Sequence, residues 1–133
     1  MSWQAYVDSS LVGTGHIDKG TILSVAGDSA WATTSGFNIQ PAEMKQISSI
    51  LSGDKNASDK AFQDGVHVAG ERYVATSIDS AENVAIFRKG KEGIIMVKSK
   101  QAIVVGHYGE MQQPGNARST VEALGDYLRK AGY

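Results

Sequence analysis

The chain has 133 residues, of which 41% are hydrophobic and 20% are charged. This length and composition predict one ordinary globular domain over residues 1–133. The formal net charge of -1 at pH 7 argues against a nucleic-acid-binding protein, because such proteins usually carry a strongly basic surface. The chain contains no cysteine, which excludes disulfides, thiolate metal sites and cysteine catalysis. We see neither a secretory signal nor an apolar run long enough to span a bilayer, and we therefore expect a cytoplasmic protein.

The first part of the chain predicts two helices on either side of a β-hairpin. Ser2 is a suitable N-cap for a helix that runs to about Leu11. Two strand-like runs over 21–25 and 30–34 flank a Gly-Asp pair, which is typical of a hairpin turn. A second helix is expected over about 41–51, because it starts with a proline and its apolar residues recur at helical spacing.

The second part of the chain predicts a β-sheet followed by a last helix. The stretch 52–65 is polar and is expected to hold one short helix, around 59–62. A final helix over about 114–130 carries an apolar stripe. Between them, short turns separate strand-like runs over 66–69, 72–77, 84–88, 94–98 and 102–107. These turns leave no room for crossover helices, so the sheet should be an antiparallel meander.

The predicted order is helix, two strands, helix, five strands, helix, which indicates a mixed α/β (α+β) fold with a central antiparallel sheet. Such a sheet must cover its apolar face. The first and last helices are the natural covers for one face. If they lie side by side, the residues near Trp3 and near Tyr127 meet.

Aromatic residues are concentrated near the two ends of the chain, where terminal segments are usually frayed and polar. Placed together over the first hairpin, their rings would form a shallow exposed patch. Aromatic patches suit polyproline, because its helix is preformed and docks between rings. The alternative is that the two tryptophans are ordinary packing residues. The aromatic set is Trp3, Tyr6, Trp31, Tyr127 and Tyr133.

Basic residues are concentrated on the later strands and turns. They could present a positive face to an acidic protein partner or to anionic lipid head groups. The alternative is a solvated sheet edge, on which lysine blocks strand-to-strand aggregation. The basic set is Arg72, Arg88, Lys89 and Lys91, with Lys98 and Lys100 on the following hairpin.

Motifs for catalysis are missing from the sequence. The histidines His16, His67 and His107 are scattered, and we expect surface or satisfied residues rather than ligands or bases. The glycine turns do not complete a phosphate-binding fingerprint, and there is no nucleophile elbow. We therefore expect neither an enzyme nor a bound cofactor or metal.

Several segments resemble profilins, in the right order and over essentially the whole chain. The opening heptapeptide and the Gly-Asp-Tyr-Leu sequence near the end are the most specific, and the resemblance is closer to protist, fungal and plant members than to vertebrate ones. The segments are Ser2-Trp3-Gln4-Ala5-Tyr6-Val7-Asp8, Leu11-Val12-Gly13-Thr14-Gly15, Ala30-Trp31-Ala32-Thr33, Pro114-Gly115 and Glu122-Ala123-Leu124-Gly125-Asp126-Tyr127-Leu128.

The resemblance implies a profilin-like single domain, with both terminal helices on one face of the sheet and shorter helices on the other. It also implies a cytoplasmic protein of the cytoskeleton that binds monomeric actin and, at a separate site, proline-rich segments of actin regulators such as formins. Its function would be to regulate actin filament assembly. The alternative is a membrane-surface regulator that binds phosphoinositides through the basic residues named above.

The resemblance also assigns site residues. The family's polyproline site corresponds to the aromatic set Trp3, Tyr6, Trp31, Tyr127 and Tyr133. The family's actin face corresponds to the later strands and the start of the last helix. It comprises Arg72, Arg88, Lys89, Lys91, Pro114, Gly115, Asn116, Arg118 and Glu122.

Overall fold

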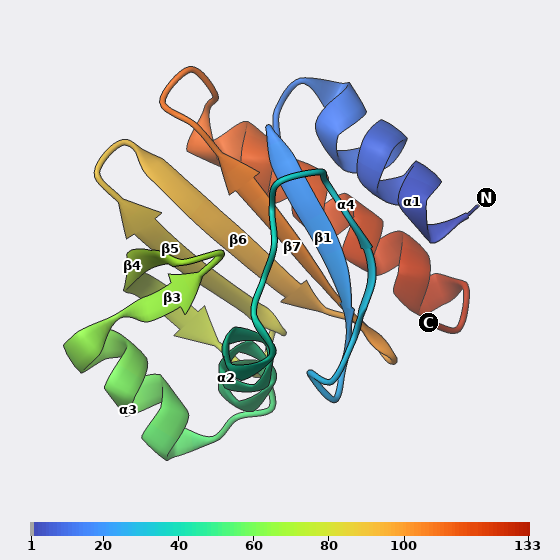
Figure 1. Ribbon diagram of the computed structural model, residues 1–133. Coiled ribbons are helices and arrows are strands. Elements are labelled where there is room, and N and C mark those ends of the chain that lie inside the picture. Colours follow the sequence, from blue (N-terminus) through green and yellow to red (C-terminus); the bar gives the residue numbers. More distant parts are fainter. Residues whose placement is uncertain (1) are drawn as a thin grey trace.

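A seven-stranded antiparallel sheet forms the centre of the computed structural model, which describes residues 2–133 (Figure 1). The strand order is β2-β1-β7-β6-β5-β4-β3, so the predicted hairpin and the predicted five-strand meander are both confirmed. The two parts join where β1 pairs with β7, a contact that the sequence analysis did not predict. The strands are β1 (Lys19–Ser24), β2 (Ala30–Thr33), β3 (Val66–Val68), β4 (Glu71–Asp79), β5 (Val84–Lys89), β6 (Glu92–Lys98) and β7 (Ala102–Tyr108).

The helices at the two ends of the chain cover one face of the sheet (Figure 1). The first begins as α1 (Trp3–Ala5), continues through the π-helical turn η1 (Tyr6–Leu11) and ends in the 3-10 turn η2 (Val12–Thr14). The last is α4 (Pro114–Lys130). As predicted, the Ser2 side chain caps the first helix, accepting a hydrogen bond from the Ala5 N–H at 3.1 Å. The buried side chains of the two helices are Val7, Leu11, Ala117, Val121, Leu124 and Leu128.

A glycine allows α4 to lie close against β6. A Cβ atom added at Gly125 would lie 2.5 Å from Val97 Cγ1, which is closer than real Cβ contacts come. The missing side chain therefore sets how closely this helix approaches the sheet, and with it the position of Tyr127 two residues further on.

Two shorter helices, α2 (Pro41–Leu51) and α3 (Lys55–Asp64), lie on the opposite face of the sheet. The bounds of α2 agree with the prediction. By contrast, α3 is longer than the predicted helix around 59–62. The Asp54 side chain caps its start by accepting from the Ala57 N–H, and Gly65 ends it at a φ of 80°. Only Ala61 is fully buried in it, so its hydrophobic periodicity is too weak to reveal its length.

A buried carboxylate ties α2 to the turn between β3 and β4. Glu43 is 8% exposed, and its two oxygens accept three backbone N–H bonds, from Gln40 at 2.8 Å, Ala69 at 2.9 Å and Gly70 at 3.1 Å. Ala69 has a φ of 53°, an unfavourable value for a residue with a side chain. The carboxylate therefore holds a strained turn in place.

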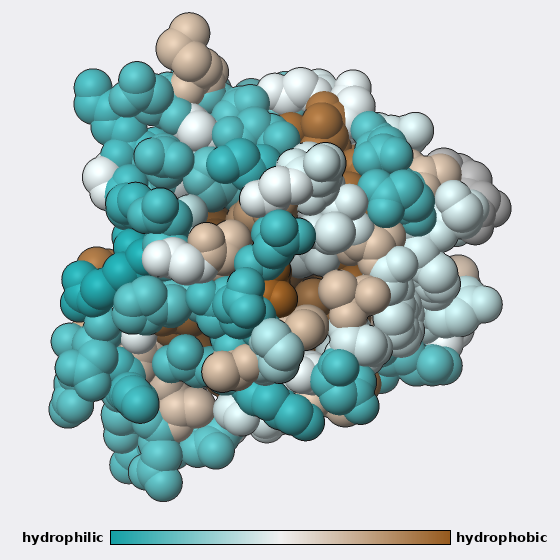
Figure 2. Space-filling view, viewed as in Figure 1, coloured by the Kyte–Doolittle hydropathy of each residue, from teal (hydrophilic) through white to brown (hydrophobic). Residues whose placement is uncertain are grey.

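The face of the molecule that carries α2 and α3 is mostly hydrophilic. In Figure 2, hydrophobic atoms reach the surface on this side only in small separate spots, while the surface over β4, β5 and α3 is largely polar. Within residues 2–133, no helix is both long enough and apolar enough to cross a membrane.

Candidate functional site

The structure brings the five aromatic residues of the sequence analysis into one continuous cluster. Trp3 contacts three other rings, with centroids 5.7 Å from Tyr6, 4.7 Å from Trp31 and 5.1 Å from Tyr133. Tyr6 in turn lies 5.7 Å from Tyr127. The first helix, strand β2, the last turns of α4 and the residues after it each supply part of this cluster, which we call the aromatic cluster. The predicted meeting of the two chain ends is therefore confirmed.

The rings of the aromatic cluster remain accessible to solvent. Tyr127 is 48% exposed and Tyr133 is 45% exposed. Trp3, Tyr6 and Trp31 are half-buried, with one side of each packed against the core beneath α4. The two tryptophans thus take part in packing, as the alternative interpretation held, but they also keep a face open to solvent.

The two tyrosine hydroxyls at one end of the aromatic cluster influence each other. The Tyr6 pKa is raised above its ordinary value, chiefly by the interaction of its hydroxyl with that of Tyr127, with a smaller contribution from burial. The Tyr6 hydroxyl therefore keeps its proton at neutral pH and can donate a hydrogen bond. Carbonyl oxygens are suitable acceptors, and proline-rich chains leave these free.

The turn between β6 and β7 holds the end of the chain in position. The Ser99 hydroxyl donates to the main-chain oxygen of Tyr133 at 2.8 Å, and the Gln101 side chain donates to that of Gly132 at 3.1 Å. Arg129 donates to the Lys98 carbonyl at 2.8 Å. This anchoring orders Tyr133, and the sequence analysis missed it because a serine in a polar turn gives no distinctive pattern.

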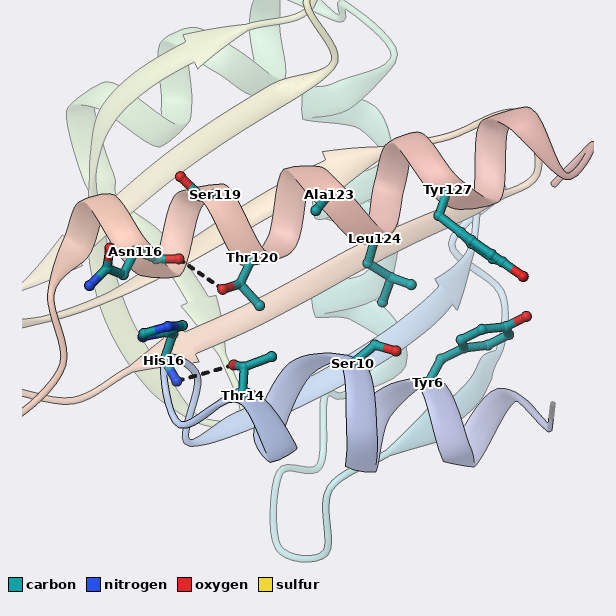
Figure 3. Close-up of a pocket in the computed structure, with 10 residues that line it drawn as sticks. All are labelled: Tyr6, Ser10, Thr14, His16, Asn116, Ser119, Thr120, Ala123, Leu124 and Tyr127. Atoms are coloured by element: carbon teal, nitrogen blue, oxygen red, sulfur yellow. Dashed lines mark hydrogen bonds between the residues drawn. The ribbon is translucent and has the colours of Figure 1, made fainter.

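A groove of about 590 Å³ lies between η1 and α4, directly beyond the Tyr6–Tyr127 pair (Figure 3). Polar side chains from both helices line it, and His16 lies at the end opposite the two tyrosines. The sequence analysis did not identify this groove. A signal was available, because its α4 residues recur at helical spacing along one stripe: Asn116, Thr120, Ala123 and Tyr127.

The structure separates the basic residues that were expected to act together. Side chains alternate between the two faces along a strand. Arg72 and Arg88 share a face with Ile86, which packs in the core beneath α4. Lys89 lies on the opposite face, where it forms an ion pair with Glu71. This ion pair raises the pKa of Lys89 and lowers the pKa of the Glu71 carboxyl. Lys91 is exposed in the β5–β6 turn.

The residues expected at the start of α4 also divide between two sides of the helix. Arg118 and Glu122 form an ion pair at 2.9 Å and face a polar groove next to the β4–β5 turn. Asn116 lines the other groove, beside η1. Pro114 and Gly115 are exposed in the first turn of the helix.

His16 and His67 are exposed, whereas His107 is buried. His107 is 2% exposed, and its ring nitrogens lie 2.5 Å from Asp18 Oδ1 and 3.1 Å from Glu92 Oε1. It is a satisfied residue, as expected. Burial raises the pKa of the neighbouring Tyr73 to about 12, with help from the carboxylates around it. Within residues 2–133, no three histidine or acidic side chains are arranged to hold a metal ion.

Comparisons with known proteins agree with this architecture. The Profilin family model matches residues 1–133. The chain is 46% identical to the profilin of Schizosaccharomyces pombe and 41% identical to profilin-1B of Acanthamoeba castellanii, with 100% of each chain covered. The solved structure of S. pombe profilin has a TM-score of 0.90 at 42% identity, covering 99% of this chain and 100% of that one.

A more distant structure shares the fold. Mouse profilin IIa, solved in complex with a double repeat from the FH1 domain of mDia1, has a TM-score of 0.82 at 18% identity, with 100% of both chains covered. The higher identities to the fungal and protist proteins confirm the expected closeness to such members. Fold and matches together define a small α/β domain of an actin-regulating family whose members are not enzymes. The chain belongs to the profilin family.

Proposed function

We propose that this protein regulates actin filament assembly in the cytoplasm by binding two partners at separate sites. The aromatic cluster binds proline-rich segments, and the sheet face beside α4 binds monomeric actin. A filament-assembly factor would then capture the actin complex through its proline tract, which raises the local concentration of monomer. The observation that carries the proposal is the unbroken series of ring contacts from Tyr127 through Tyr6 and Trp3 to Trp31 and Tyr133.

The geometry of the aromatic cluster supports a proline-rich ligand. A polyproline helix is already ordered before binding, and it needs flat apolar surfaces and donors for its free carbonyls. Five partly exposed rings supply the surfaces, and the indole and phenol groups supply the donors. The FH1 repeat bound to the mouse neighbour supports formin segments as ligands to test. Because the cluster is shallow, we expect dissociation constants in the range of ~µM to mM.

Intrinsic tryptophan fluorescence provides the direct test of the aromatic cluster. Both tryptophans of the chain lie in it, so binding of poly-L-proline should change the emission without any label. Calorimetry on the same samples gives the affinity. If the emission does not change and calorimetry detects no heat of binding, the proposal for this site is wrong.

The uncovered part of the sheet supports an actin-binding face. The side of β4 that carries Arg72 is open to solvent, and Val74 on the same side is 46% exposed. Val74 pairs with Arg88 across the β4–β5 ladder, so an apolar and a basic side chain lie side by side there. Polar side chains around an exposed apolar spot are typical of a protein interface.

A pull-down from cell lysate on the immobilised protein tests the actin proposal. The parent protein should retain an actin-sized band that Arg88→Glu loses. Lys60→Glu is the matched control, because Lys60 is an exposed residue of α3 on the other face of the sheet. Equal retention by parent and Arg88→Glu would argue against this face.

Phosphoinositide binding is the second candidate function. Its support is that Arg88 and Lys91 are exposed and form no ion pair within residues 2–133, whereas Lys89 is paired with Glu71. Co-sedimentation with anionic vesicles tests it. Binding should fall with rising salt and be lost on combining Lys91→Ala with Arg88→Ala. Absence of binding at moderate salt would remove this candidate.

A further inference from the structure

The groove beyond the Tyr6–Tyr127 pair continues the aromatic cluster without a break, because both tyrosines belong to both features (Figure 3). Its volume of about 590 Å³ is in the range of ordinary ligand sites. A ligand that crosses the aromatic cluster in this direction passes over the contacting rings of the two tyrosines and enters the groove.

The lining of the groove is polar and apolar but holds none of the permanently charged side chains. It contains no lysine, arginine, aspartate or glutamate. Leu124 and Ala123 supply an apolar strip on α4, and hydroxyl, amide and imidazole groups surround that strip (Figure 3). A charged ligand segment would lose hydration there and find no opposite charge to compensate for it.

Several polar groups in the groove have free hydrogen-bonding capacity. Thr14 and Thr120 donate their hydroxyls to the backbone carbonyls of Leu11 and Asn116. The side chains of Ser10, Ser119 and Asn116 form no hydrogen bond within residues 2–133. Ser10 and Asn116 are therefore available to donate to a ligand, whereas the Ser119 hydroxyl points away from η1 (Figure 3). The backbone carbonyls of an extended ligand segment are suitable acceptors for these donors.

We propose that the groove is a second subsite for the proline-rich ligand, which takes the uncharged segment that flanks the proline tract. This inference rests on the proposed function of the aromatic cluster. The subsite selects among proline-rich ligands by the residues next to the tract, whereas the aromatic cluster binds the tract itself. Tyr6 and Tyr127 contribute to both subsites.

The length of the groove sets the length of the flanking segment. Its α4 wall runs from Asn116 to Tyr127, which at ~1.5 Å of rise per residue is about 16 Å. An extended ligand advances ~3.1 Å per residue in the polyproline conformation, so about five residues fill the groove.

Calorimetry with two kinds of peptide tests the inference. The first is a proline decamer. The second carries five additional uncharged residues, Ala-Leu-Ala-Gly-Ala, on one end or the other, since the groove does not define the direction of the chain. We expect one extended peptide to bind about fivefold more tightly than the decamer, which corresponds to one or two added hydrogen bonds. The same extension with two residues replaced by glutamate or lysine should bind no more tightly than the decamer.

Two variants locate the gain in the groove. Ala123→Leu fills the groove from an exposed helical position and should abolish the gain, leaving the affinity for the decamer within about twofold. Ser10→Ala should reduce the gain in affinity to about twofold. Ala81→Leu, in the turn between β4 and β5 away from the groove, is the matched control and should retain the full gain.

The outcomes separate this inference from the proposed function. If the decamer binds but neither extension improves affinity, the second subsite is wrong and the aromatic cluster stands. The inference is also wrong if the gain survives in Ala123→Leu, or if the charged extensions gain as much as the uncharged one. If the decamer itself does not bind the parent protein, the aromatic site and the subsite that depends on it both fail.

Discussion

The ring of Trp3 meets the ring of Tyr133 edge-on, with centroids 5.1 Å apart and planes at 88°. This contact joins residues from opposite ends of the chain, and the hydrogen bonds from the β6–β7 turn to the last residues support it. The aromatic cluster therefore depends on the whole fold, because the sheet and both terminal helices must be in place before its rings meet.

Replacing Tyr133 by alanine removes one exposed ring from the aromatic cluster. The loss of its stacking surface should weaken poly-L-proline binding by about tenfold, a typical cost for an aromatic contact residue at an interface. The free energy of unfolding should change little, because the ring is 45% exposed. Calorimetry measures the first quantity and urea denaturation the second. Phe62→Ala, which removes a 51% exposed ring on α3, should leave the affinity unchanged; an equal loss in both variants would contradict the prediction.

Replacing Ser99 by alanine tests whether the β6–β7 turn positions Tyr133. Ser99 lies in the β6–β7 turn and is not one of the five aromatic residues, but its hydroxyl bonds to the Tyr133 main chain. The variant should lower polyproline affinity by about three- to fivefold, because the ring is less firmly placed before binding.

A purely structural role for Ser99 would give a different result. The same hydroxyl also bonds to Ala102 within the turn, so the variant should unfold at a slightly lower temperature as well. The informative comparison is the double variant with Tyr133→Ala. If Ser99 acts through Tyr133, its effect on affinity disappears in that background, whereas an unchanged effect would show that it acts in another way.

Much of this architecture could be predicted from local patterns in the sequence. Val7 and Leu11 are four residues apart in the sequence, which is the spacing of one apolar helical face, and both are buried. The apolar stripe predicted for the last helix contains Val121 and Leu128, which are also buried. Helices that bury one stripe each against the same sheet have little freedom in where their ends lie. For that reason the meeting of Trp3 with the C-terminal tyrosines could be expected from the order of the predicted elements alone.

Other features depend on contacts that no local pattern encodes. The β1–β7 pairing and the His107–Asp18 contact join residues far apart in the sequence. The placement of Arg88 and Lys89 on opposite faces of the sheet is different, because adjacent residues of a strand point to opposite faces. Strand periodicity alone would have separated them, but the sequence analysis grouped them by charge.

The pKa of Tyr6 should fall when Tyr127 is replaced by phenylalanine. In the parent protein the interaction between the two hydroxyls raises the Tyr6 pKa, so the folded state favours the protonated phenol. The stabilisation is then fully present below the ordinary tyrosine pKa of about 10 and is lost as the pH rises through the higher folded value. Removing the Tyr127 hydroxyl should shift the Tyr6 titration toward the ordinary value.

Nuclear magnetic resonance of tyrosine rings carrying a carbon label can follow this titration residue by residue. Tyr73 is the internal control, because burial raises its pKa to about 12 and it lies outside the aromatic cluster. Its titration should be the same in both proteins. A Tyr6 titration that does not move in Tyr127→Phe would rule out the hydroxyl interaction as the main cause.

Replacing Glu43 by alanine should destabilise the protein without changing the aromatic cluster. The variant leaves the Ala69 and Gly70 N–H groups without their acceptor and releases a turn that holds Ala69 at a φ of 53°. Losing these bonds should lower the free energy of unfolding by about 2–4 kcal/mol, as measured by urea denaturation. Glu43→Gln keeps one acceptor oxygen, so it should lower the free energy of unfolding by about half as much.

Glu110→Ala, at an exposed site, is the control, and its free energy of unfolding should lie within about 0.5 kcal/mol of that of the parent. Because Glu43 packs on the opposite face of the sheet from Trp3, polyproline affinity of the folded variant should match that of the parent, and a large loss of affinity would show that the two faces are coupled.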